Sequence, residues 1–163
     1  AAEAIAVDDI NGLVYAANPG NNWVETLTKS SLDMLPLLYG FNNPRAVATD
    51  PNTGDFYVGE MCAIKKYTKD RTLLKSFGSC GWGFPPNGLL SQVGSLAVDK
   101  YGYVYVGDGN SSYIHKFDSE GNFIVEWRVN GNYSNINSIH VNSSGYVYIT
   151  LFGNNLLQIY EPR

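Results

Sequence analysis

The chain has 163 residues, a formal net charge of −4 and a hydrophobic fraction of 44%, which suffices for one domain with a buried core. Only 16% of the residues are charged, whereas tyrosine and glycine are frequent, and this composition favours β structure. Lys and Arg are fewer than Asp and Glu and form no basic cluster, which argues against nucleic-acid binding, and no apolar run approaches the roughly 20 residues of a membrane-spanning helix.

The first predicted elements are two strands joined by a tight turn. An apolar strand ends at Asp8, the turn contains Gly12, and the next strand runs through Leu13-Val14-Tyr15-Ala16. Asp and Gly suit such a turn, because Asp bonds the neighbouring backbone and Gly accepts a positive φ. Two further strands are expected at 24–27 and 37–39.

This unit recurs three more times, and in each copy a Tyr stands three residues after the turn Gly. Strands are expected at 47–50, 55–58, 64–67 and 73–77, then at 96–99, 103–106, 114–117 and 123–127, and finally at 139–142, 146–149 and 157–160. The residues that end the first strand of each copy lie 42, 49 and 43 residues apart: Asp8, Asp50, Asp99 and Asn142. That period is typical of a propeller blade.

The sequence therefore predicts an all-β protein, a β-propeller of four-stranded antiparallel blades in a single domain spanning 1–163. About four blades are expected, at 4–43, 44–94, 95–137 and 138–163, with the last one incomplete because it stops after its third strand.

The third copy carries a resemblance to a known family. Its run from Val104 to Phe123, with Gly107-Asp108-Gly109-Asn110 after the second strand, resembles an NHL repeat nearly position for position. The second copy departs from that pattern at Glu60-Met61-Cys62 and the fourth at Leu151-Phe152-Gly153. Most NHL propellers resemble six-bladed rings, so three arrangements remain: a closed four-bladed ring, a ring completed by another chain, or part of a longer polypeptide. The last two are favoured, because open blade faces would expose apolar surface.

The two cysteines and three glycosylation sequons bear on localisation. Cys62 and Cys80 fall in loops expected at the same end of a blade, which favours a disulfide over two free thiols. Sequons begin at Asn110, Asn132 and Asn142, each in a predicted turn or loop. Together these features predict a secreted or extracellular glycoprotein.

Four residues are candidates for contact with a ligand. His140 is a large side chain on the innermost strand, where the other copies have Ala6, Ala48 and Ala97, so it is expected beside the central channel. Trp23, Glu60 and Asp108 lie in the loops that form the usual binding face of a propeller, although ordinary turn chemistry would also explain them. His115 stands where the other copies have the polar residues Glu25, Lys65 and Gln158, so it is expected to be solvated.

The predicted function is that of a non-catalytic binding or structural module that recognises a protein, a glycan or other copies of itself, without a cofactor. No catalytic residue, metal ligand or zinc motif is predicted. The alternative is an enzyme that uses the propeller funnel, of the Ca²⁺-dependent lactonase or amidating-lyase type, because the fold alone does not decide between them.

Overall fold

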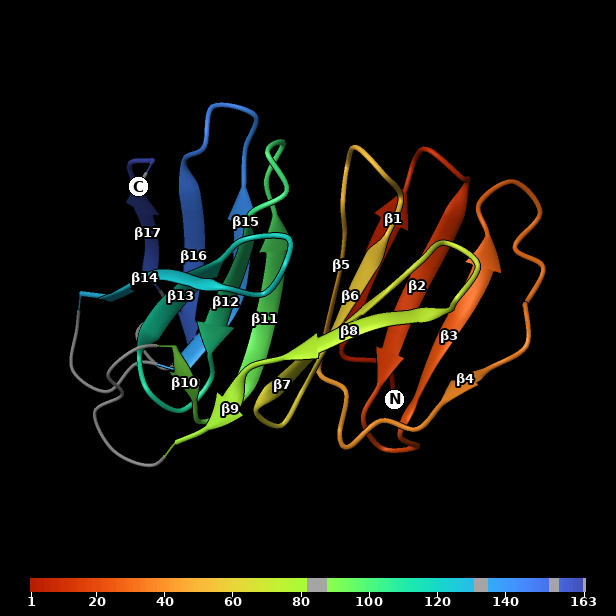
Figure 1. Cartoon of the computed structure of the whole chain (residues 1–163), viewed down its shortest axis with the longest axis horizontal. Helices are drawn as coiled ribbons and strands as arrows, with labels where there is room; N and C mark the ends of the chain where they lie inside the picture. Colours follow the sequence, from red (N-terminus) through yellow and green to blue (C-terminus); the bar gives the residue numbers. More distant parts are fainter. Residues whose placement is uncertain (82–87, 131–134, 153–155, 163) are drawn as a thin grey trace.

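The computed structural model describes residues 1–81, 88–130, 135–152 and 156–162, and these residues form an all-β propeller. Four antiparallel sheets follow one another in chain order around a common axis (Figure 1). The predicted fold class is thereby confirmed. Within the described ranges there is no helix with the length and apolar character needed to cross a membrane.

Each sheet is a meander in which neighbouring strands in the sequence pair. The first blade holds β1 (Ala4–Asp8), β2 (Leu13–Asn18), β3 (Trp23–Thr28) and β4 (Leu38–Tyr39). The second holds β5 (Ala46–Thr49), β6 (Phe56–Glu60), β7 (Ala63–Tyr67) and β8 (Leu73–Phe77). The third holds β11 (Val93–Val98), β12 (Val104–Asp108), β13 (Tyr113–Phe117) and β14 (Phe123–Arg128). The described part of the fourth holds β15 (Asn135–Val141), β16 (Val147–Phe152) and β17 (Leu156–Tyr160).

The recurring Asx, Gly and Tyr build the first hairpin of each blade. In the third blade, Asp99 Oδ1 accepts hydrogen bonds from the backbone amides of Tyr101 and Tyr103 at 2.8 and 3.0 Å, and the Tyr105 hydroxyl donates to Asp99 Oδ2 at 3.1 Å. Gly102 adopts a φ of 83°, which a side chain would make unfavourable. The repeated pattern thus stabilises the hairpin, and the Asx side chains make hydrogen bonds within it.

Successive blades pack face to face, and three hydrophobic clusters fill the three seams between them. We call the side of a blade that meets the next blade its following face, and the opposite side its preceding face. The recurrent Tyr lies on the following face, and Tyr15, Tyr57 and Tyr105 are 0%, 0% and 1% exposed. Tyr15, for example, stacks on Phe56 of the second blade with 4.1 Å between ring centroids. Burial raises the pKa of all three tyrosines well above the usual value.

A disulfide joins Cys62, in the turn between β6 and β7, to Cys80 in the short strand β9 (Ser79–Cys80). β9 pairs in parallel with β10 (Leu89–Leu90) in the connection that leads to the third blade. The predicted bridge is confirmed. Its 18-residue separation corresponds to about 3 kcal/mol of stabilisation in the chain-entropy estimate.

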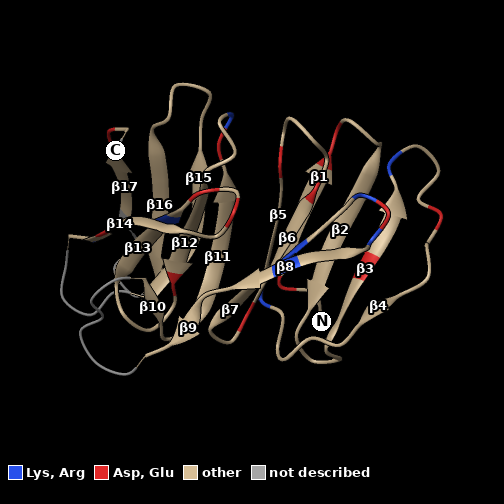
Figure 2. Cartoon of the chain, viewed as in Figure 1, with Lys and Arg blue, Asp and Glu red and all other residues tan. Residues whose placement is uncertain are grey.

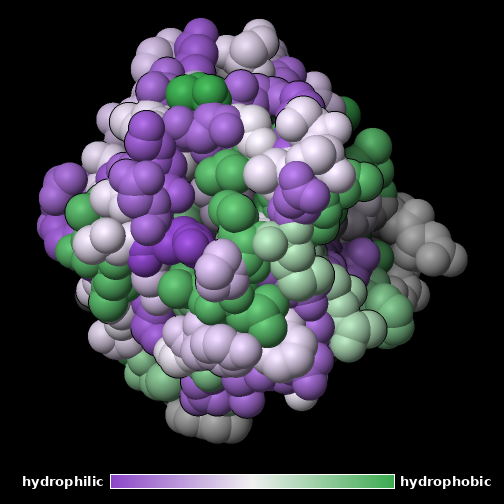
Figure 3. Space-filling view, turned by 90° about the vertical axis from the view of Figure 1, so that its right-hand side faces the viewer, coloured by the Kyte–Doolittle hydropathy of each residue, from purple (hydrophilic) through white to green (hydrophobic). Residues whose placement is uncertain are grey.

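The outer surface mixes polar and apolar residues. Lys and Arg are interspersed with Asp and Glu in the view of Figure 2, without a basic face. Apolar side chains gather in the middle of the side seen in Figure 3, surrounded by hydrophilic ones.

Candidate functional site

The central channel is lined by equivalent segments of the four innermost strands. A cavity of about 360 Å³ is bounded by Glu3-Ala4-Ile5, Arg45-Ala46-Val47, Gly94-Ser95-Leu96 and Asn137-Ser138-Ile139. Each segment stands at the same place in its blade, because it begins five residues before the recurrent Asx, which is Asp8, Asp50, Asp99 or Asn142. The repeat therefore presents one residue of each blade to the same level of the channel: Glu3, Arg45, Gly94 and Asn137.

These four residues also line an adjoining cavity of about 370 Å³ at the mouth of the channel. The mouth adds the polar side chains of Gln92, Asn110 and Asn135 and the ring of Phe152, which is 73% exposed. Gly94 and Asn137 stand at the register shifts of β11 and β15, where a bulge leaves a residue out of the regular pairing. The mouth thus combines residues of all four blades, with irregular strand pairing in the third and fourth.

Hydrogen-bond donors and hydrogen-bond acceptors meet at the mouth. Arg45 Nη1 lies 3.4 Å from Glu3 Oε2, and this ion pair joins the first two blades, whose inner strands are neighbours. Arg45 Nε is buried and has no hydrogen-bond partner within the described residues. Asn110 Nδ2 donates to Gln92 Oε1 at 3.0 Å, so the amides on the third blade are held in place.

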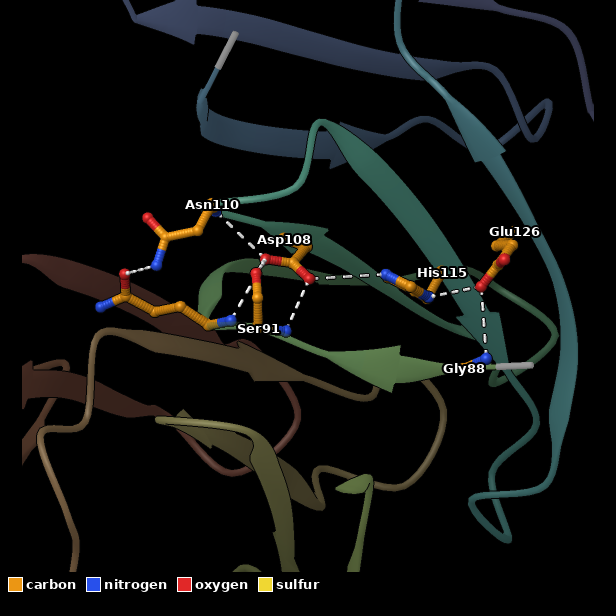
Figure 4. A network of polar contacts seen from close by, with 7 residues as sticks. Gly88, Ser91, Asp108, Asn110, His115 and Glu126 are labelled. Carbon is orange, nitrogen blue, oxygen red and sulfur yellow. Dashed lines mark hydrogen bonds and ion pairs between the residues drawn. The ribbon is translucent and has the colours of Figure 1, made fainter. Parts of the chain in front are cut away.

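Beside the mouth, Asp108 holds together a buried polar network (Figure 4). Its carboxylate accepts hydrogen bonds from the backbone amides of Ser91, Gln92 and Asn110 and from the Ser91 hydroxyl. His115 Nε2 lies 3.7 Å from Asp108 Oδ2, and His115 Nδ1 lies 3.1 Å from Glu126 Oε2. The network fixes the segment that enters the third blade against the hairpin that carries Asn110.

The protonation of Asp108 follows from these contacts. Burial alone would raise the pKa of Asp108, but His115 and the hydrogen bonds from Ser91 and Asn110 outweigh burial and bring it down to about 2. Asp108 is therefore a carboxylate at neutral pH.

Glu60 occupies the same place in the second blade. Glu60 Oε2 accepts a hydrogen bond from the backbone amide of Asn42 at 2.7 Å, and Lys65 Nζ lies 2.8 Å from Glu60 Oε1. Lys65 and His115 are equivalent, since each is paired with the central Val of the neighbouring strand. Both carboxylates thus anchor the segment that enters their blade.

In the first blade, Asn18 takes the place of Glu60 and Asp108 at the end of the second strand, and the carboxylate belongs to Glu25 on β3. Trp23 Nε1 donates to Glu25 Oε1 at 2.9 Å, and Asn18 Nδ2 donates to the same oxygen at 3.3 Å. Trp23, Glu60 and Asp108 all make internal contacts, and none of them lines the two cavities of the channel. Their predicted contact with a ligand stays a prediction.

The two histidines lie in opposite environments. The expectation that His115 is solvated is wrong: its side chain is 0% exposed, because the seam between the second and third blades covers its face. His140 is exposed on the following face of the last blade, with its ring centroid 6.3 Å from that of Tyr148, and it is not among the channel-lining residues.

The sequons differ in how free their Asn is. Asn110 is exposed at the mouth, whereas Asn142 Nδ2 donates to the Tyr148 hydroxyl at 3.2 Å and its Oδ1 accepts two backbone hydrogen bonds in the hairpin. Asn132 lies outside the described residues. Glycosylation of all three stays a prediction.

Sequence reasoning missed the channel residues themselves, in particular Arg45, Gln92 and Asn137. The signal that could have found the channel positions is that Glu3, Arg45, Gly94 and Asn137 each stand five residues before the recurrent Asx of their blade, but their types differ, so they form no motif. Within the described residues, no group of three or more His, Cys, Asp or Glu side chains is arranged to hold a metal ion.

Fold and channel together define the chain as a β-propeller. No protein-family profile matches the chain, so the NHL assignment stays a prediction, and no curated protein matches its sequence. A solved structure of Kuenenia stuttgartiensis hydrazine synthase is similar, with a TM-score of 0.79 and 10% sequence identity over 98% of this chain and 46% of that chain. The chain thus spans less than half the length of that structure, and the likeness concerns the fold alone.

Proposed function

We propose that this chain is a secreted, non-catalytic binding module of NHL type whose channel mouth recognises a neutral glycan. The observation that carries the proposal is the composition of the mouth, where amide side chains from two blades surround a cavity of about 370 Å³ beside an exposed aromatic ring. Such a site has the concave shape and the few convergent polar groups of a small-ligand pocket.

The chemistry of the mouth suits sugar hydroxyls. Each amide of Gln92, Asn135 or Asn137 offers both a donor and an acceptor, which matches a hydroxyl group. Phe152 offers an apolar ring against which the C–H face of a sugar can pack. The charges of Arg45 and Glu3 neutralise each other, so an uncharged ligand fits better than an anion.

Binding can be tested by titrating the ¹⁵N-labelled protein with a panel of neutral oligosaccharides. We expect amide signals of the mouth to shift, and the double variant Asn135→Ala/Asn137→Ala to weaken binding at least tenfold. Asn42→Ala is the matched control, because Asn42 is an exposed Asn that does not line the mouth and that bonds Glu60 through its backbone. If no glycan shifts the mouth signals while a protein ligand does, the glycan proposal is wrong.

Secretion has its own test. Intact mass before and after deglycosylation, on protein from a eukaryotic secretory host, should show glycan on Asn110 at least. Because Asn110 lines the mouth, a glycan there would compete with an external ligand, and Asn110→Gln should then strengthen binding. Unmodified protein would contradict the glycoprotein part of the proposal.

A further inference from the structure

His115 lies buried between two carboxylates behind the channel mouth. Its Nε2 is 3.7 Å from Asp108 Oδ2 and its Nδ1 is 3.1 Å from Glu126 Oε2, so each ring nitrogen faces a carboxylate oxygen (Figure 4). The side chains of His115 and Asp108 are 0% exposed, and that of Glu126 is 17% exposed. The charges of the three groups are therefore balanced mainly by one another and little by water.

The doubly protonated ring is the form that suits both contacts. A neutral imidazole has one N–H and one lone pair, so either tautomer would direct a lone pair at a carboxylate. The imidazolium instead directs an N–H and its positive charge towards each side. A buried carboxylate without such a partner is unfavourable, and here two carboxylates depend on the same ring.

Every element packed around the ring was considered as a source of charge. β12 contributes Asp108, β14 contributes Glu126, and the strand of His115 itself contributes Tyr113, with 6.3 Å between the two ring centroids. The following face of the second blade, which meets this side of the third, carries three further titratable groups: Tyr57, Lys66 and Lys75. Each of these lysines has its own carboxylate, at 3.5 and 3.2 Å. Among the described ion pairs, those of Asp108 and Glu126 both go to His115.

Asp108 connects the ring to the mouth. The backbone amides of Gln92 and Asn110, two residues that line the cavity of about 370 Å³, each donate to Asp108 Oδ1 at 3.1 Å. At the start of the segment that enters the third blade, the Gly88 amide donates to Glu126 Oε2 at 3.2 Å. Both ends of the segment that carries Gln92 are therefore held by carboxylates that share one imidazole.

We propose that His115 is a positioning residue whose ring proton fixes the third-blade side of the mouth. This inference rests on the proposed function and adds its regulation: the site is ordered while the ring is an imidazolium and is loosened as the pH rises and the ring becomes neutral. Without the imidazolium, Asp108 and Glu126 either repel each other or take up a proton, and both outcomes weaken their hold on the entering segment. Ligand affinity should then fall with rising pH in step with the titration of the ring.

The second blade offers a counterpart that does not depend on a histidine proton. Lys65 occupies the equivalent place, with its Nζ 2.8 Å from Glu60 Oε1, and Glu60 Oε2 accepts a hydrogen bond from the Asn42 amide at 2.7 Å. Lysine keeps its charge through the neutral range, in which histidine titrates. The Asn42 amide is thus an internal control, and His115→Lys is the matched variant.

NMR titration of the free ¹⁵N-labelled chain between about pH 5 and 9 tests the coupling without a ligand. Long-range ¹H–¹⁵N spectra report the protonation of the His115 ring, and a parallel His140→Gln sample identifies the signals of the second histidine. We expect the amides of Gln92 and Asn110 to shift along the same curve as the ring, and the Asn42 amide to be independent of it. A ring that keeps one protonation state over this range, or mouth amides that do not follow the ring, would overturn the proposal.

Two variants separate the charge of the ring from its presence. In both His115→Lys and His115→Gln the pH-dependent shift should vanish, and amide exchange of Gln92 and Asn110 should be about tenfold slower in His115→Lys, which keeps the charge. Equal exchange in the two variants would show that the charge does not position the mouth, and the wild-type titration decides the matter if a variant fails to fold. An oligosaccharide that shifts the mouth signals should bind wild type about tenfold more weakly above the titration of the ring than below it. Failure of every oligosaccharide at every pH would contradict the glycan proposal alone, because the amide signals report the role of His115 without a ligand.

Discussion

Single buried polar residues hold the second strand of a blade to its third strand. Asp108 with His115, Glu60 with Lys65, and Asn18 with Glu25 all join the end of a blade's second strand to its third. The two carboxylates also accept hydrogen bonds from the segment that enters the blade. A carboxylate that loses such partners would be left buried and uncompensated, which costs more than the contact itself contributes.

Asp108 should make the stability of the protein depend on pH in acid. Its pKa is lowered to about 2, so its contribution to the free energy of unfolding is present above the unfolded pKa near 4 and is lost as the pH falls towards 2. In urea titrations followed by tryptophan fluorescence, wild type should lose about 2 kcal/mol more than Asp108→Asn between pH 5 and 2.

The control for this prediction is Asp70→Asn, in the exposed turn between β7 and β8, which should lose as much stability as wild type between pH 5 and 2. At pH 7, Asp108→Asn should itself be less stable than wild type by roughly 2 kcal/mol, because an amide cannot accept all the hydrogen bonds that the carboxylate accepts. An equal loss of stability between pH 5 and 2 in wild type and in Asp108→Asn would show that Asp108 does not cause the pH dependence.

At the scale of residues, the sequence predicted the disulfide but neither the burial of His115 nor the residues of the mouth. The disulfide between Cys62 and Cys80 follows from loop placement, and the structure confirms it. The burial of His115 could not be predicted, because strand alternation assigns a residue to a face but does not tell whether the neighbouring blade covers that position. The residues of the mouth were missed because the four equivalent positions, Glu3, Arg45, Gly94 and Asn137, differ in chemical type and therefore form no recognisable motif.

At the scale of elements, the second strand of each blade sets how closely two blades approach. Gly59 on β6 and Gly107 on β12 lie where the inner strand of the next blade passes, and both are too close to that strand for a Cβ. The fold class could be predicted because the same strand–turn–strand unit recurs four times with one period. The distance between blades could not, since it depends on pairs of residues far apart in the sequence.

Gly107→Ala should lower the free energy of unfolding by about 1–3 kcal/mol, because its Cβ would overlap Ile136 in a packed seam. Gly20→Ala is the matched control: its nearest atoms would lie 3.7 Å away, in ordinary contact, and the stability should change by less than about 0.5 kcal/mol. Thermal or urea unfolding of the two variants measures both values. Equal stability of the two would mean that the seam between the third and fourth blades is looser than described.

At the scale of the whole molecule, the described residues form three seams between four successive blades, and each seam is filled by its own hydrophobic cluster. The four inner strands face one channel, so the residues that line the channel come from all four blades.

The channel places one residue from each blade at a common level, and those four positions hold an acid, a base, a glycine and an amide on an otherwise uniform frame. Side chains there point into open space and carry little of the packing between sheets. Exchanging them would alter what the molecule recognises while leaving its architecture untouched, so descendants of one repeat array could diversify in specificity through very few codon changes.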